Sequence, residues 1–195
     1  MKVKNFRAFR VIKAESLKYE ESVFSGKTTI CRNDCSCNFR QVYEAAFEEV
    51  RGQQCPELPS RLECIFVFPN KDNYFEWTPY EGGQCYLLEL ELEGNLVWLD
   101  AKFINEDLTA FLLKADNLNE KDMDQIREIA AQYWDTASEK VLNSVQCEGL
   151  FVGEAIIISI EEINVKPKCH KKQTSIKVCD DFICKPTSDD ELLKD

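Results

Sequence analysis

Residues 86–100 read YLLELELEGNLVWLD, with leucine and glutamate alternating up to a Gly94-Asn95 pair. Alternation of apolar and charged side chains with a period of two is typical of a strand with one buried and one solvated face. Gly-Asn is a two-residue hairpin signal, so a second strand is predicted over residues 96–99. Asp100 is then expected to act as a cap or turn residue where the hairpin ends.

Further strands are predicted on both sides of this hairpin. Residues 6–12 are rich in β-formers, residues 62–68 form a nearly continuous apolar run typical of a central strand, and residues 155–163 form a late strand. Cys64 and Cys85 lie in such apolar runs, where cysteine usually behaves as a small buried hydrophobe. These segments are expected to build a β-sheet.

Three helices are predicted between the strands. The first follows Asn38 and ends near Val50, and the second is capped by Asn105. The third follows Asn119 and carries an apolar stripe at helical spacing, made by Met123, Ile126, Ile129, Ala130, Tyr133 and Trp134. Because strands and helices are mixed without a βαβ rhythm, the predicted fold class is α+β.

Length and composition fit one globular domain. The chain has 195 residues, of which 44% are hydrophobic and 30% charged, which is unlike a disordered chain. We expect a domain over residues 1–165, a strand or hairpin appendage over 166–185, and a frayed acidic tail over 186–195.

Charge and hydropathy exclude several classes of protein. The net charge of −11 disfavours non-specific nucleic-acid binding, because the chain as a whole repels phosphate. The most apolar stretch, residues 155–160, is far shorter than the roughly 20 residues of a membrane span. Residues 1–7 lack the apolar core of a secretion signal. A cytoplasmic protein with mostly reduced cysteines, and without a membrane partner, is therefore expected.

The cysteines and the single histidine do not form a standard site. Cys31, Cys35 and Cys37 lie close together, but a zinc site usually needs a second ligand pair at a distance, and none is evident. We therefore expect no bound metal. A regulatory protein stapled by a zinc ion is the alternative hypothesis for these cysteines. The chain lacks G-x-G-x-x-G, a phosphate loop, H-E-x-x-H and G-x-S-x-G. His170 lies in a late polar segment, which disfavours it as a general base.

Four segments together carry a resemblance to a known superfamily. They are residues 9–12, residues 47–51 leading to 59–62, the predicted 86–100 hairpin, and Tyr133-Trp134 followed by residues 146–148. In order and spacing they resemble a family of small bacterial and phage-type domains of the ADP-ribosyltransferase superfamily, across residues 6–163. The resemblance implies a split β-sandwich with flanking helices, whose cleft holds NAD in a bent conformation.

The resemblance also implies roles for particular residues. Arg10 corresponds to a first-strand arginine that contacts the dinucleotide, and Ser60 to a serine that buttresses the pocket, with Arg61 beside it. Ser60-Arg61-Leu62 departs from the Ser-Thr-Ser motif of the toxins, and relatives with histidine in place of Arg10 put its contact with NAD in question. Tyr43, Trp77, Tyr80 and Tyr86 are candidates to stack on nicotinamide.

Glu148 is the expected catalytic carboxylate. Breaking the nicotinamide–ribose bond develops an oxocarbenium-like cation, which a carboxylate held nearby stabilises. Gln146, two residues earlier, matches the position of a substrate-orienting residue. Glutamine there favours asparagine side chains or nucleic-acid bases as acceptors over arginine. The implied function is cleavage of NAD, as substrate, with transfer of ADP-ribose to an unknown macromolecular acceptor.

Simpler interpretations remain for the same residues. Arg10 can be a strand-edge charge, Ser60 can belong to a turn before a strand, and Tyr133-Trp134 fits a core better than a cofactor site. Glu148 has rivals that include the solvated-face series Glu89, Glu91 and Glu93, and also Glu154, Glu161 and Glu162. A second functional hypothesis is therefore a catalytically inactive, acidic binding or antagonist module on the same fold, suited to a basic partner surface.

Overall fold

Two long curved strands, β3 (Gly83–Asp100) and β5 (Cys147–Val165), form the framework of the protein. They pair antiparallel along their whole length, and β1 (Lys2–Lys13) pairs antiparallel with the other edge of β3. The short strand β2 (Ile65–Val67) pairs with the beginning of β5, which gives the order β1-β3-β5-β2. This computed structural model describes residues 1–14, 38–77, 83–112, 117–166 and 177–178.

The predicted hairpin at residues 86–100 is wrong, because these residues form one continuous bent strand. Gly94 lies opposite Gly153 of β5. A Cβ on Gly94 would lie 2.4 Å from the carbonyl oxygen of Val152, and one on Gly153 would lie 2.4 Å from that of Glu93. Both glycines also have positive φ, +159° and +153°. They allow the two strands to approach closely where both bend. The chain therefore bends at Gly94 and does not reverse there.

The sheet curls until its two outer strands meet. Phe9 in β1 and Phe68, just after β2, exchange two backbone hydrogen bonds of 2.9 and 2.8 Å. The alternating glutamates of β3 lie on the outside of this curl, where Arg7 pairs with Glu89 and Glu91. The inside is filled by an apolar cluster: Ala8, Ile12, Ile65, Val67, Leu88, Leu90, Leu92, Leu96, Trp98, Cys147 and Phe151.

Residues 62–68 do not form the central strand that their apolar run predicted. Only Ile65–Val67 are in a strand, and β2 stands at the end of the sheet order. The run is nevertheless largely buried, because Cys64 packs in the helix-side core while Ile65 and Val67 pack inside the curled sheet. Burial by two different layers produces the same continuous apolar pattern as a central strand.

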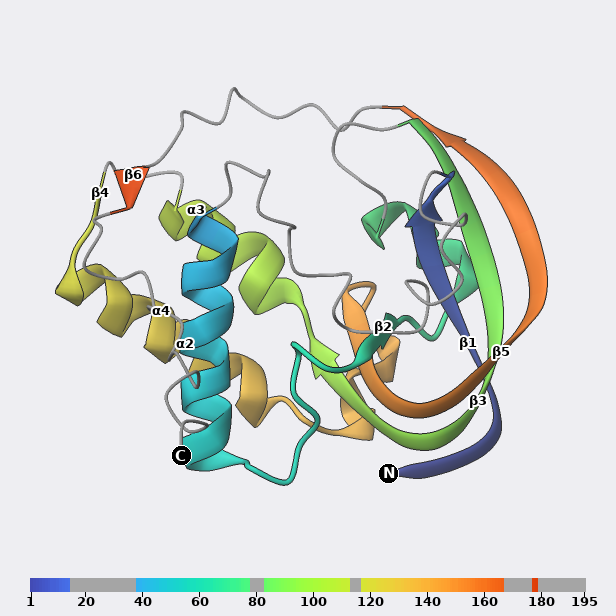
Figure 1. Ribbon diagram of the computed structural model, residues 1–195, viewed down its shortest axis with the longest axis horizontal. Helices are drawn as coiled ribbons and strands as arrows, with labels where there is room; N and C mark the ends of the chain where they lie inside the picture. The colour runs from blue at the N-terminus through green and yellow to red at the C-terminus, as the bar shows by residue number, and fades with distance from the viewer. Residues whose placement is uncertain (15–37, 78–82, 113–116, 167–176, 179–195) are drawn as a thin grey trace, which may run out of the picture.

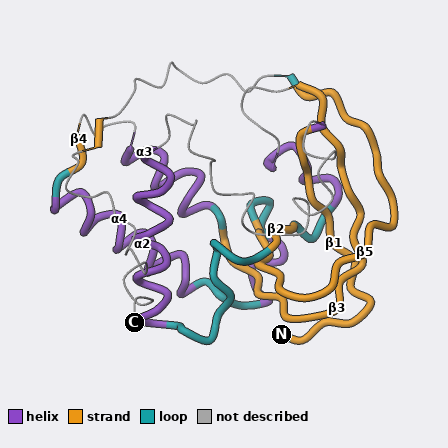
Figure 2. The backbone as a smooth tube through the Cα atoms, in the orientation of Figure 1, coloured by secondary structure: helices purple, strands orange, loops and turns teal. Residues whose placement is uncertain are grey.

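The helices form a second layer beside the curled sheet (Figures 1 and 2). The predicted first and third helices are confirmed as α2 (Asn38–Gln54) and α4 (Glu120–Asp135). Asn119 caps α4 in a capping box with Asp122. Every residue of the predicted α4 stripe is buried: Met123, Ile126, Ile129, Ala130, Tyr133 and Trp134.

The second predicted helix is present, but its predicted cap is wrong. A π-helix, η4 (Phe103–Leu108), begins before Asn105 and continues into α3 (Thr109–Leu112). Asn105 therefore lies inside the helical segment, where its amide donates to Gln146 Oε1 at 3.0 Å. Asp100 does act as a turn residue, since its Oδ1 accepts from the backbone N–H of Lys102.

The remaining elements are short. The 3-10 helices η3 (Lys71–Trp77) and η5 (Glu139–Asn143) follow β2 and α4. Strands β4 (Asn117–Leu118) and β6 (Lys177–Val178) form a parallel pair. Cys31, Cys35, Cys37, His170 and the predicted tail lie outside the described residues.

The described residues also show the burial of two cysteines and can be searched for a metal-ligand cluster and a membrane-spanning helix. Cys64 and Cys85 are fully buried thiols, as predicted. Within the described ranges, no three His, Cys, Asp or Glu side chains gather closely enough to hold a metal ion. Nor do these ranges contain a helix with the length and apolarity to cross a membrane.

Candidate functional site

Buried charges gather where the helical layer meets the sheet. In the part of the chain that the structure describes, the buried charged side chains are those of Glu44, Arg61 and Glu148, which are 7%, 6% and 4% exposed. Glu44 comes from α2, Arg61 from the turn before β2, and Glu148 from the beginning of β5. Charged side chains are seldom buried unless they are paired, so their mutual contacts decide what this cluster does.

Arg61 joins the three elements. Its Nε donates to Glu44 Oε2 at 3.0 Å and its Nη2 to Glu44 Oε1 at 3.4 Å. Its Nη1 donates to Glu148 Oε1 at 2.5 Å and to Tyr133 Oη, from α4, at 2.6 Å. The planar guanidinium thereby fixes both carboxylates at once, which a lysine could not do. It also lies over three aromatic rings, at 4.8–5.7 Å from their centroids: Phe66, Tyr133 and Phe47.

Glu148 is held through one of its two carboxylate oxygens. Oε1 accepts from Arg61 and from Tyr133 Oη, the latter at 2.6 Å. No donor among the described residues pairs with Oε2. In the described part, the fully enclosed polar side-chain atoms without a partner are Arg10 Nε, Trp77 Nε1 and Trp98 Nε1. Glu148 Oε2 is not one of them. The arrangement orients the carboxylate and leaves one oxygen for another donor.

Burial and charge set the protonation of the groups around Glu148. Burial lowers the pKa of Arg61, but the nearby carboxylates of Glu148 and Glu44 outweigh it and raise that pKa well above its usual value. Burial raises the pKa of Tyr133 well above its usual value; the positive charge of Arg61 opposes this shift and the carboxylate of Glu148 adds to it. Arg61 therefore stays charged and Tyr133 stays protonated, so both keep donating to Glu148.

Cys64 lies beside this network as a neutral thiol. Its Sγ donates to the carbonyl oxygen of Arg61 at 3.7 Å. Burial raises its pKa to about 12, although the positive charges of Arg61 and Arg10 oppose the shift. A thiol with so high a pKa is not a nucleophile at neutral pH.

Arg10 brings a second positive charge to the same region. Arg10 lies between Ala8 and Ile12 in the alternation of β1, on the face that these two residues turn toward the core of the curled sheet. Its Nη1 donates to the carbonyl oxygen of Phe66 at 3.0 Å, while its Nε is buried without a partner. Burial lowers the pKa of Arg10 to about 10, so it remains charged at neutral pH. No carboxylate among the described residues forms a salt bridge with it.

Comparison with known proteins gives one family. The model of a family described as "Protein of unknown function (DUF2441)" matches residues 4–165, most of the chain. The protein belongs to the DUF2441 family. The matched region contains Arg10, Arg61 and Glu148, and no curated protein matches the chain.

Ser60 and Gln146 of this DUF2441 protein bond away from Glu148. Ser60 Oγ donates to Glu48 Oε2 at 2.9 Å and accepts from the backbone N–H of Leu62. It therefore buttresses the turn that carries Arg61. The side chain of Gln146 is held by η4, because Asn105 donates to its Oε1 and its Nε2 donates to Glu106 at 2.6 Å.

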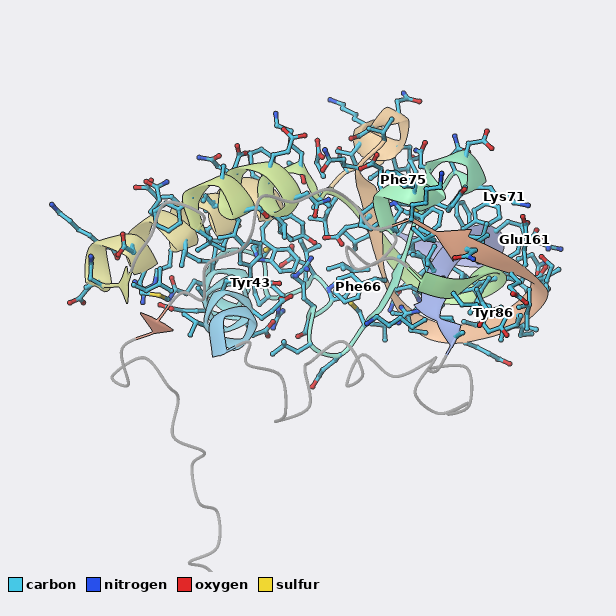
Figure 3. All side chains as sticks on the ribbon, turned by 90° about the horizontal axis from the view of Figure 1, so that it is seen from above. Tyr43, Phe66, Lys71, Phe75, Tyr86 and Glu161 are labelled. Atoms are coloured by element: carbon cyan, nitrogen blue, oxygen red, sulfur yellow. The ribbon has the colours of Figure 1, made fainter. Side chains whose placement is uncertain are left out.

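Two of the predicted aromatic residues, Tyr43 and Tyr86, lie on different layers, and Tyr80 lies outside the described residues. Tyr43 belongs to α2, where its ring meets the Phe47 ring edge-on at 6.1 Å. Tyr86 belongs to β3 and lies opposite Ile12 on one side and Glu162 on the other. Figure 3 shows Tyr43 and Tyr86 well separated, with Phe66 between them. Both tyrosines are partly buried, and neither bonds to Glu148.

Two residues of the network, Glu44 and Tyr133, were not predicted as site residues. Tyr133 was assigned to the core, which is correct for its ring but overlooks its hydroxyl group. Glu44 lies three residues before Phe47 on the buried side of α2, so it interrupts an apolar stripe with a charge. A glutamate in such a position requires a buried partner, and this signal is visible in the sequence.

Proposed function

We propose that this protein is an ADP-ribosyltransferase-like enzyme that cleaves NAD and transfers ADP-ribose to a protein side chain or a nucleic-acid base. The observation that carries the proposal is the state of Glu148, held at Oε1 by Arg61 and Tyr133, with Oε2 lacking a donor among the described residues. The proposal includes a split β-sandwich. The sheet curls until its two outer strands meet, which is compatible with such a fold.

The chemistry uses the second oxygen of Glu148. When the bond between nicotinamide and ribose C1′ breaks, nicotinamide leaves with the bonding electrons and C1′ becomes positively charged. Glu148 stabilises that charge, and its Oε2 can accept a hydrogen bond from the ribose 2′-hydroxyl. The acceptor then bonds to C1′ and releases its proton to solvent. A carboxylate oriented beforehand loses less free energy in reorganising at this step.

Arg10 supplies the proposed contact with NAD. Its guanidinium is charged, has no described carboxylate partner, and has a buried Nε without an acceptor. A guanidinium has five N–H donors, and among the described residues that of Arg10 donates only to the carbonyl oxygen of Phe66. The phosphate or ribose oxygens of NAD are acceptors of the required kind.

The other predicted residues take supporting roles in this proposal. Arg61 positions Glu148, and Ser60 holds the turn from which Arg61 comes. Gln146 has its amide orientation fixed by Asn105 and Glu106, which suits a residue that orients an asparagine or a base. Tyr43 and Tyr86 remain candidates for stacking on nicotinamide.

One observation favours the alternative of a catalytically inactive, acidic binding module. Glu148 forms a buried ion pair with Arg61, and both side chains are only 5–6% exposed. This pairing neutralises part of the charge that a ribosyl cation would need. The two hypotheses differ in whether NAD is consumed.

Nicotinamide release from NAD by the purified protein, with and without cell lysate, separates them. We expect release by the wild type and a reduction of about 10²–10³-fold in the Glu148→Gln variant, as for loss of a main electrostatic stabiliser. Glu128→Gln, an exposed position on α4, is the matched control and should retain full activity. Absence of release by the folded wild type under both conditions would favour the binding module.

A further inference from the structure

The outer edge of β5 has a long segment without a neighbouring strand. β3 pairs with β5 along its whole length, whereas β2 pairs with the other edge only at Gly149–Phe151. No strand of the described part pairs with that edge from Val152 to Val165. In Figure 1, β5 is the outermost strand on the right of the sheet. An unpaired edge presents backbone N–H and C=O groups that can accept another strand.

Exposed apolar side chains concentrate on this segment. The described residues include seven exposed large hydrophobic side chains, and four belong to this part of β5 with exposures of 43–51%: Val152, Ile156, Ile158 and Ile160. A register shift beside Ile158 changes the alternation. Ile156 therefore lies opposite Glu91 on the solvated face, while Ile160 lies opposite Leu88 on the core face. An added strand would cover isoleucine on both faces.

The charges of the segment are all negative. Residues 152–165 contain Glu154, Glu161 and Glu162 and no lysine, arginine or histidine. Lys71 reaches Glu161 at 2.6 Å, but both side chains are more than half exposed, so solvent screens this pair (Figure 3). The glutamates, with the net charge of −11, repel a second copy of the chain and attract a cationic strand.

We propose that the β5 edge from Val152 to Asn164 is a docking site for an extended, basic peptide that combines apolar residues with lysine or arginine. The peptide adds as a further strand, with backbone hydrogen bonds supplying affinity and the isoleucines and glutamates supplying selectivity. This inference does not depend on NAD chemistry, because Glu148 lies on the other half of β5, between β3 and β2.

The test uses a fluorescent nine-residue peptide of alternating lysine and valine, with binding followed by anisotropy against the full chain. We expect Ile156→Ser/Ile160→Ser to weaken binding at least about tenfold, since two half-exposed isoleucines lose their apolar contact. Val145→Ser is the matched control, because Val145 is 58% exposed but lies outside this edge. It should change binding by less than about twofold.

Two further peptides test the charge and the strand geometry. A glutamate–valine peptide should not bind, and neither should the lysine–valine peptide carrying two central prolines, which lack N–H donors. Replacing Glu154, Glu161 and Glu162 by glutamine should weaken binding of the lysine–valine peptide and reduce its salt dependence. Equal binding of the acidic peptide, or no binding of the basic one, overturns the proposal.

Amide hydrogen exchange of residues 152–165 in the full chain identifies any other occupant. We expect fast exchange at the amides that point away from β3 in the free protein, and protection when the basic peptide binds. Slow exchange in the free monomer would mean that the chain covers its own edge. A dimer that Ile156→Ser/Ile160→Ser dissociates would mean a second copy. Either result contradicts an external basic peptide.

Discussion

The two halves of β5 have different environments although they belong to one strand. Residues 147–151 are all buried, between β3 and β2, and include Glu148. Residues 152–164 are mostly exposed, although they contain more isoleucine than the first half. Burial here follows from which elements cover the strand and not from how apolar it is. As a result, the protein keeps a carboxylate inside and several isoleucines outside.

The largest expected effect comes from removing the cation of the buried half. Arg61→Met removes the cation that Glu44 and Glu148 share and leaves both carboxylates buried. We expect the free energy of unfolding to fall by about 3–5 kcal/mol, measured by urea denaturation at pH 7. Arg127→Met is the control, because Arg127 is 37% exposed and pairs with surface carboxylates. It should cost less than about 1 kcal/mol, and equal losses in the two variants would refute a buried network.

The boundary between the halves is sensitive to a single methyl group. In Gly153→Ala the new Cβ would lie 2.4 Å from the carbonyl oxygen of Glu93, so β3 and β5 must move apart. We expect a loss of about 1–3 kcal/mol in the same unfolding measurement. Gly52→Ala, in α2 with nothing within 4 Å of its Cβ, should instead stabilise the protein by about 0.5–1 kcal/mol. A tolerated Gly153→Ala would contradict the paired-glycine bend.

The sequence was sufficient for elements whose signals are local. The start of α4 after Asn119 and its apolar stripe depend on residues within a few positions of one another, and both predictions are confirmed. The hairpin was wrong because the role of Gly94 depends on Gly153, a partner distant in sequence. Local turn chemistry cannot distinguish a glycine needed for a turn from one needed for close approach.

The site was predictable as a set of residues but not as a geometry. Arg61 and Glu148 were both named from the resemblance, yet their direct bond was not expected. Glu44 and Tyr133 were overlooked as partners, because α2, α4 and β5 meet only after the chain has folded. Helical periodicity predicts which face is buried, and it does not identify the polar atom that lies opposite.

Alkaline pH should test the burial of two thiols, Cys147 in the buried half of β5 and Cys64 just before β2. Burial raises the pKa of Cys147 on β5 and of Cys64 to about 12, from about 9. Above pH 9 the unfolded chain loses these protons while the folded protein retains them, so stability falls as pH rises. The expected slope is up to about 1.4 kcal/mol per pH unit for each thiol under reducing conditions. Cys64→Ala should flatten the pH profile between 9 and 12, and an unchanged slope would show that Cys64 does not contribute.

The smallest effect is expected in the exposed half. Ile158 is 43% exposed at the edge of the sheet, and Ile158→Ser should change the free energy of unfolding by no more than about 0.5 kcal/mol. The measurement is again urea denaturation at pH 7. A loss well above 1 kcal/mol would mean that part of the protein covers this edge, and the contrast between the two halves of β5 would then disappear.

The most direct test of the account is the nicotinamide released per folded molecule by Glu148→Gln, measured beside its free energy of unfolding. Glutamine keeps an oxygen that can accept from Arg61 and Tyr133 but lacks the negative charge. The account predicts a loss of turnover of about 10²–10³-fold per folded molecule, and the unfolding measurement separates this loss from the destabilisation caused by removing one charge of a buried pair. Turnover equal to that of the wild type would contradict a catalytic role for Glu148 and leave it a structural partner of Arg61.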